Sequence, residues 1–84
     1  MKVPEQFIPS NPDDLEKGKI VAVFIGRGCN LGIIEFKGKR QSIIRFMHGG
    51  EQLVENKRLL IVDDEKQKEM AIRGIEKHFP KVQQ

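Results

Sequence analysis

Residues 18–46 read GKIVAVFIGRGCNLGIIEFKGKRQSIIRF, and this stretch decides the fold. The run at 20–25 is apolar throughout and rich in β-branched residues, which is typical of a short strand covered on both faces. The runs at 33–36 and 42–46 continue the strand pattern, and glycine-containing turns separate the runs at 26–30 and 37–40. The stretch therefore predicts three successive short antiparallel strands.

The residues on both sides extend this pattern. The segment at 52–54 is a candidate strand, a turn is expected at Asn56-Lys57, and 58–62 is another compact apolar strand. Four or five short strands with glycine turns predict a closed small β-barrel, because closure leaves no exposed sheet edge. We expect one core, to which Ile20, Val23, Ile34, Ile44 and Leu60 contribute, and we also assign Phe24, Phe36 and Phe46 to the core.

The spacing of the apolar residues changes after residue 62, from a strand pattern to a helical one. Asp63 or Asp64 is expected to cap a helix that Pro80 ends, with an apolar stripe on one face and charges on most of the other. Gly74 interrupts this helix, which indicates a close neighbour at that point. The stripe consists of Ala71, Ile72, Ile75 and Phe79. At the other end of the chain, residues 1–16 are expected to form an extended arm with one short helical turn that Asn11 caps.

The sequence thus predicts one mainly β domain in three segments. These are an N-terminal arm at 1–16, a small barrel at 17–62, and a C-terminal amphipathic helix at 63–80 packed on the same domain. Eighty-four residues allow one small core. A single cysteine excludes an internal disulfide, and the sequence has neither a membrane-length apolar run nor a signal-peptide pattern. A cytoplasmic protein without a membrane partner is expected.

The stretch LEKGKIVAV at 15–23 resembles the entry to SH3-like small barrels, in which a turn ending in glycine leads into the first strand. The resemblance covers residues 15–62. It implies a barrel whose loops and strand face bind RNA or DNA in many members and peptides in others. The chain has no Trp and no Tyr. Because peptide-binding SH3 domains use these residues to line their groove, recognition of proline-rich peptides is not expected.

Positive charge is concentrated in the predicted barrel. The whole chain carries a net charge of +3, whereas residues 17–58 carry nine Lys or Arg against three Glu. Such an excess attracts anionic partners. We expect one positive surface that contacts the backbone of RNA or DNA, with backbone contact dominating over base reading because the phenylalanines are assigned to the core. The residues assigned to this surface are Arg27, Lys37, Lys39, Arg40 and Arg45.

Catalytic and cofactor sites are not expected. The glycines at 26–32 have the spacing G-x-G-x-x-x-G and precede no helix, so a bent hairpin turn is favoured over a phosphate cradle. Cys29 and His48 are interpreted as loop residues rather than a nucleophile and its base, and with His78 they have no metal-ligand spacing. The sequence therefore predicts a small binding module that is not an enzyme and needs no cofactor or metal.

The alternative function is a protein-interaction or adaptor module that uses the barrel and the C-terminal helix. The apolar stripe of the helix could pack on its own barrel, on a protein partner or on a second copy of the chain. The sequence leaves these alternatives open, together with the choice between RNA and DNA.

Overall fold

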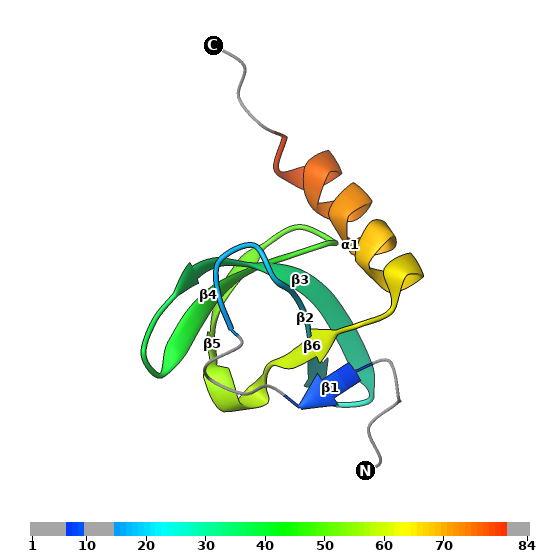
Figure 1. Cartoon of the computed structure of the whole chain (residues 1–84). Coiled ribbons are helices and arrows are strands. Elements are labelled where there is room, and N and C mark those ends of the chain that lie inside the picture. Colours follow the sequence, from blue (N-terminus) through cyan, green and yellow to red (C-terminus); the bar gives the residue numbers. More distant parts are fainter. Residues whose placement is uncertain (1–6, 10–14, 81–84) are drawn as a thin grey trace.

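The computed structural model describes residues 7–9 and 15–80. Within these ranges the chain forms one antiparallel sheet of six strands and one α-helix, so the fold is mainly β, as predicted (Figure 1). The strands are β1 (Phe7–Pro9), β2 (Ile20–Ile25), β3 (Gly28–Lys37), β4 (Gln41–Phe46), β5 (Glu51–Glu55) and β6 (Leu60–Val62). A 3₁₀ helix, η2 (Asn56–Arg58), connects β5 to β6, and α1 (Glu65–His78) follows. The helical turn expected at Asn11 lies outside the described residues.

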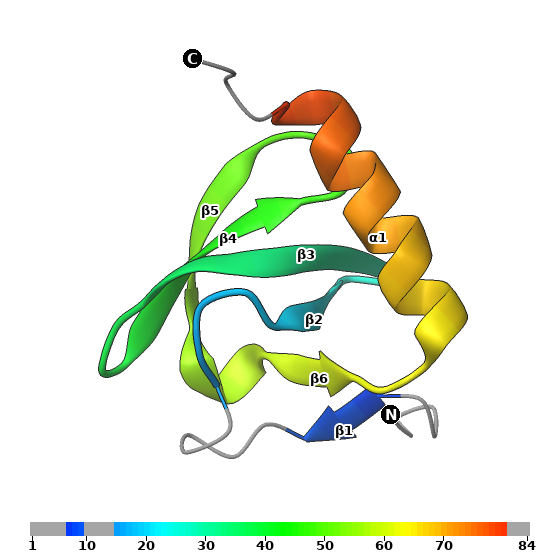
Figure 2. The same cartoon turned by 45° about the horizontal axis from the view of Figure 1, so that its top comes forward.

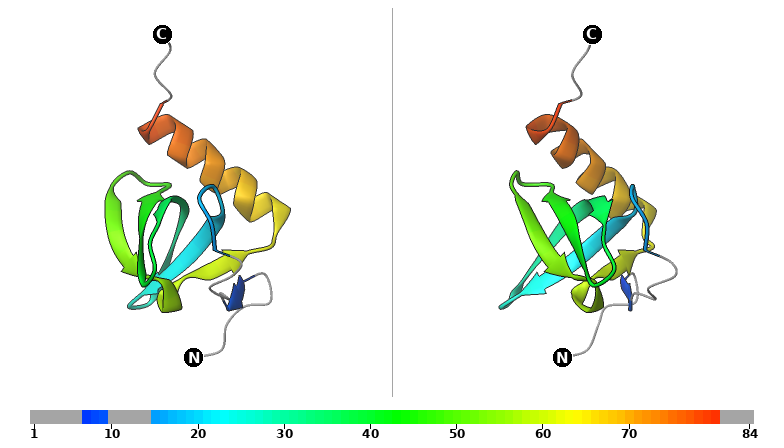
Figure 3. Two further views of the ribbon diagram at one scale, coloured as in Figure 1. Left: turned by 60° about the vertical axis from the view of Figure 1, so that its left-hand side comes forward. Right: turned by 90° about the vertical axis from the view of Figure 1, so that its left-hand side faces the viewer.

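The strands lie in the order β1-β6-β2-β3-β4-β5, and every neighbouring pair is antiparallel. Part of the N-terminal arm joins the sheet, because β1 pairs with β6. The sheet is strongly curled (Figure 3), yet its two margins, β1 and β5, do not pair with each other in the described chain. The sheet is therefore open, and the predicted barrel closure is not confirmed.

The apolar run in β2 is buried on both faces, as predicted. Val21 and Val23 face the inside of the curl, whereas Ile20 and Ala22 face α1. The prediction of one core is therefore wrong, since the sheet separates two clusters. The inner cluster contains Leu15, Val21, Val23, Ile34, Ile44, Phe46, Val54 and Leu59. The outer cluster, beneath the helix, contains Ile20, Ala22, Leu31, Val62, Ala71 and Ile75.

Helix α1 begins where the sequence predicted. The Asp64 carboxylate accepts a 2.9 Å hydrogen bond from the backbone N–H of Gln67 and caps the first turn. The helix lies across one face of the sheet (Figure 2), with Ala71 and Ile75 buried against it. Gly74 allows this close approach: a Cβ there would lie 2.5 Å from the carbonyl oxygen of Met47. The close neighbour inferred from this glycine is confirmed.

A β-bulge in β3 overturns the expectation that Phe36 belongs to the core. Ile34 pairs with Ile44, but Phe36 pairs with the adjacent Ile43, so the register shifts between Ile34 and Phe36. Because side chains alternate along a strand, regular pairing would place Phe36 inside with Ile34. The bulge turns Phe36 outward, where 60% of its surface is exposed. Of the other two phenylalanines assigned to the core, Phe46 is buried and Phe24 is half-buried.

The turn after β2 is shorter than the glycine pattern predicted. Only Gly26 and Arg27 form it, and β3 starts at Gly28. Gly26 has a φ of 59°, a left-handed conformation that glycine adopts without steric cost. Cys29, expected in a turn, is therefore a strand residue opposite Phe24.

Candidate nucleic-acid interface

The loop between β3 and β4 carries Lys39 and Arg40, two of the five predicted site residues, and a third, Lys37, is the last residue of β3. Asn56 of η2 holds the backbone of this loop. The Asn56 Nδ2 group donates 3.1 Å hydrogen bonds to the carbonyl oxygens of Gly38 and Lys39. The backbone N–H of Asn56 donates a third, 2.8 Å bond to the carbonyl oxygen of Arg40. Because all three carbonyls bond to one residue, the loop has a defined backbone conformation from which its basic side chains project.

Gly38 is required in this loop by close packing. Its φ is not positive, but a Cβ at this position would collide with the carbonyl oxygen of Gln41. The backbone at Gly38 therefore approaches the Gln41 carbonyl more closely than a residue with a Cβ would allow. The glycine predicted for a hairpin turn is thus essential for a steric rather than a dihedral reason.

The 3₁₀ helix also connects this loop to the end of β2. An Arg58 Nη2 group donates a 3.4 Å hydrogen bond to the carbonyl oxygen of Phe24, close to the turn that contains Arg27. The β3–β4 loop and η2 lie together, whereas the β2–β3 turn lies at the opposite end of β3: in Figure 2 the loop is at the far left and the turn is on the right, near α1. We call the surface formed by the end of β3, the β3–β4 loop and η2 the basic end, and it comprises Lys37, Lys39, Arg40, Lys57 and Arg58. Arg27, which the sequence assigned to the same surface, lies in the turn at the other end of β3.

The cations of the basic end are exposed and almost unopposed. All are exposed except Lys37, which is half-buried. Among the described residues, Lys57 is the one member that has a carboxylate within 4.0 Å, at 3.8 Å from Glu55. Five of the nine cations of residues 17–58 therefore lie on one surface.

Arg45 does not belong to this surface. Its guanidinium pairs with the carboxylates of Glu51 and, at 3.5 Å, Glu35, and it lies 5.1 Å from the ring centroid of Phe79. The hydrogen bond with Glu51, together with the attraction of both carboxylates, raises the pKa of Arg45 above its ordinary value. Two carboxylates offset the one positive charge, so Arg45 contributes little attraction for a polyanion.

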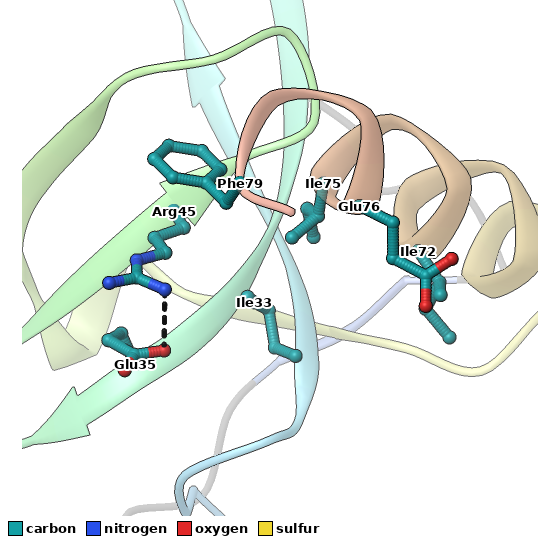
Figure 4. Close-up of a pocket in the computed structure, with 7 residues that line it drawn as sticks. All are labelled: Ile33, Glu35, Arg45, Ile72, Ile75, Glu76 and Phe79. Carbon is teal, nitrogen blue, oxygen red and sulfur yellow. Dashed lines mark ion pairs between the residues drawn. The ribbon is translucent and has the colours of Figure 1, made fainter. Parts of the chain in front are cut away.

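Arg45 instead borders a pocket of about 300 Å³ between α1 and the sheet (Figure 4). Apolar side chains line most of the pocket, and Arg45, Glu35 and Glu76 are its charged groups. In Figure 4 the Arg45–Glu35 ion pair closes one side. The apolar lining residues are Ile33, Ile72, Ile75 and Phe79.

The thiol and histidine considered in the sequence form no catalytic pair. Cys29 is exposed on β3, and desolvation raises the pKa of its thiol, which disfavours the reactive thiolate. His48 lies in the β4–β5 loop beside the Phe46 ring, and no interaction joins it to Cys29 within the described residues. No group of three or more His, Cys, Asp or Glu side chains suited to a metal ion occurs in residues 15–80.

Sequence reasoning missed two members of the basic end, Lys57 and Arg58. The available signal was the turn predicted at Asn56-Lys57, since a turn places its side chains in solvent. What the sequence could not provide was the contact of this turn with residues 38–40.

No family model, curated protein or solved structure matches this chain. The described residues include no helix that is long and apolar enough to cross a membrane.

Proposed function

We propose that this protein is a binding module that contacts the backbone of RNA or DNA through the basic end. The observation that carries the proposal is that two adjoining regions, η2 and the end of β3 with the β3–β4 loop, together present five cations with one carboxylate partner among the described residues. Contacts with phosphates supply most of the non-specific affinity for nucleic acids, and each requires a Lys or Arg that is not already neutralised.

The cations of α1 provide the contrast. Lys68 pairs with Glu65 at 3.6 Å, and Arg73 pairs with Glu69 at 3.1 Å. These are exposed pairs that contribute little stability, but they bring negative charge to the same surface. On α1, carboxylates therefore lie beside cations, whereas at the basic end only Lys57 has a carboxylate within 4.0 Å among the described residues.

The curled sheet is proposed to be an SH3-like barrel. Support comes from the inner cluster, which takes Val54 from the marginal strand β5 and Leu59 from the residue before β6. Further support is the bond from Arg58 to Phe24, which brings η2 onto β2. In such a barrel the β3–β4 loop and η2 meet although they are distant in sequence, and Asn56 bonds to the carbonyl oxygens of Gly38 and Lys39.

We propose binding without catalysis. The single thiol is exposed, its pKa is raised, and it has no base beside it among the described residues. A surface of lysines and arginines on loops binds phosphates but has no group poised to exchange protons near neutral pH.

The test is a direct binding measurement. Fluorescence anisotropy of labelled single-stranded and duplex RNA and DNA, titrated with the protein at low salt, is expected to show binding to several unrelated sequences. Affinity is expected to fall as salt rises, with a log–log slope of about −0.7 to −0.9 per phosphate neutralised. Absence of binding at tens of micromolar protein would refute the proposed function.

A second candidate function is protein interaction through α1 and the adjoining pocket. The observation that favours it is that Met70 and Ile72 on the helix are 46% and 42% exposed, and Ile72 also lines the pocket. A protein partner or a second copy of the chain could cover these side chains. Sedimentation of the protein alone and with an Ile72→Asp variant tests self-association.

A further inference from the structure

Phe36 lies at the end of a row of apolar side chains on the outer face of the sheet. It pairs with Ile43 on β4, which in turn pairs with Leu53 on β5, so the three residues lie side by side across three strands. Phe36 is 60% exposed and Leu53 is 56% exposed. Exposed large apolar side chains are ordinary when scattered, but a contiguous row indicates a binding surface.

The ring of Phe36 leans toward the basic end. Its Cε2 atom lies 3.8 Å from the position that a Cβ on Gly38 would occupy, so the ring is beside the β3–β4 loop. Lys39 and Arg40 lie in this loop, whereas Lys37, the next residue of β3, pairs with the buried Ser42 and is on the opposite face of the sheet. A flat aromatic face is therefore bordered by cations that have no carboxylate within 4.0 Å among the described residues.

We propose that the nucleic acid bound at the basic end is single-stranded, and that a base stacks on Phe36 while Lys39 and Arg40 contact the flanking phosphates. This inference rests on the proposed function and assigns its ligand class. Single-stranded binding sites combine a basic path for the backbone with aromatic side chains on which bases stack. Bases in a duplex are already stacked on their neighbours and cannot present a face to Phe36.

The charges around Phe36 favour a polynucleotide over a protein partner on this face. An apolar protein surface would have to bury the ring next to Lys39 and Arg40, each of which would lose solvent without gaining a carboxylate. A single strand offers a base for the ring and phosphates for the cations within one or two nucleotides. Ile43 and Leu53 extend the apolar area for the neighbouring base or sugar.

The absence of Trp and Tyr from the chain makes a direct test possible. A Phe36→Trp variant contains one tryptophan, whose fluorescence is expected to be quenched when a base of oligo(U) or oligo(dT) stacks on it. The matched control is Met70→Trp, since Met70 is also an exposed apolar residue beside Lys66 and Arg73, but on α1. The inference is supported if the oligonucleotide quenches the fluorescence of Phe36→Trp and leaves the fluorescence of Met70→Trp unchanged.

The second measurement compares affinities by anisotropy. Phe36→Ala is expected to bind single strands about 5- to 150-fold more weakly than the wild type. Phe36→Leu is expected to lose nearly as much, Phe36→Trp to retain affinity, and duplex binding to be almost unaffected. Because Phe36 is exposed, its replacement leaves the fold intact, and circular dichroism checks this.

The outcomes separate the two proposals. If the wild type binds no nucleic acid, the proposed function and this inference both fall. If it binds with a steep salt dependence but Phe36→Ala binds single strands equally well, or the residue 36 indole is not quenched, only the inference is overturned. It is also overturned if the wild type sediments as a dimer that Phe36→Ala converts to a monomer with unchanged affinity, since a second copy would then occupy the row.

Discussion

The Ser42 hydroxyl donates a 2.6 Å hydrogen bond to the Oδ1 atom of Asn56, and both side chains are buried. This pair joins β4 to η2 in the interior of the protein. It also orients the Asn56 amide, so that the Nδ2 group points at the carbonyl oxygens of the β3–β4 loop. A buried polar contact thus positions the exposed basic loop.

The Ser42→Ala variant is expected to lower the free energy of unfolding by about 1–3 kcal/mol, because it removes the buried hydrogen bond from the Ser42 hydroxyl to Asn56 Oδ1. Urea denaturation measures the change, and Gln52→Ala on the exposed side of β5 is the matched control. Amide hydrogen exchange at Asn56, whose N–H bonds to Arg40, is expected to accelerate in Ser42→Ala. An unchanged exchange rate would contradict the link between this pair and the loop.

The combined substitution of Lys37, Lys39 and Arg40 by Ala is expected to weaken binding to all nucleic-acid sequences. On single strands the log–log salt slope is expected to become shallower by about 2, which corresponds to three lost phosphate contacts. Anisotropy titrations over a series of salt concentrations measure both effects.

The matched control replaces Lys66, Lys68 and Lys77 of α1 by Ala. It removes the same net charge from the protein but not from the basic end. If both triple variants lose equal affinity and slope, the effect reports overall charge and no particular surface binds the nucleic acid.

Arg45→Ala is expected to leave nucleic-acid affinity unchanged, although the sequence alone groups this residue with the site. Its charge is already offset by Glu35 and Glu51. The loss of these exposed ion pairs is expected to lower stability by less than about 1 kcal/mol. Anisotropy measures the affinity and urea denaturation measures the stability of the same preparation. A marked loss of affinity in Arg45→Ala would show that Arg45 does contact the nucleic acid.

Gly74→Ala is expected to destabilise the protein, the reverse of the usual effect in a helix. Alanine is favoured over glycine within a helix by about 1 kcal/mol. Here, however, the new Cβ would lie 2.5 Å from the Met47 carbonyl oxygen and 2.8 Å from the Met47 Cβ, so α1 must move off the sheet. Thermal denaturation measures the sign, with the exposed substitution Lys77→Ala as control. A higher melting temperature for Gly74→Ala would show that the helix is not held so closely.

Ile72→Asp is expected to change neither the sedimentation of the protein nor its affinity for nucleic acid, because Ile72 is 42% exposed and lies on α1, which is no part of the basic end. Analytical ultracentrifugation is the measurement. A wild type that self-associates and an Ile72→Asp variant that does not would favour the protein-interaction function over the nucleic-acid function.

Much of the secondary structure follows from the sequence because it depends on local signals. The continuous apolar run at 20–25 determines a strand buried on both faces, and Asp64 before an amphipathic segment determines where α1 begins. The concentration of positive charge in residues 17–58 is also a property of the sequence. These features require no knowledge of which distant residues meet.

The composition of the candidate site was decided by tertiary structure. A one-residue register shift in β3 turns Phe36 from the inside of the sheet to its surface, and alternation along the sequence cannot reveal such a shift. Whether a cation is free depends on distant carboxylates: Arg45 meets Glu35 and Glu51, while Lys39 has no such partner among the described residues. The sequence determines how many charges the domain carries, but the pairing of strands determines which of them remain available to a ligand.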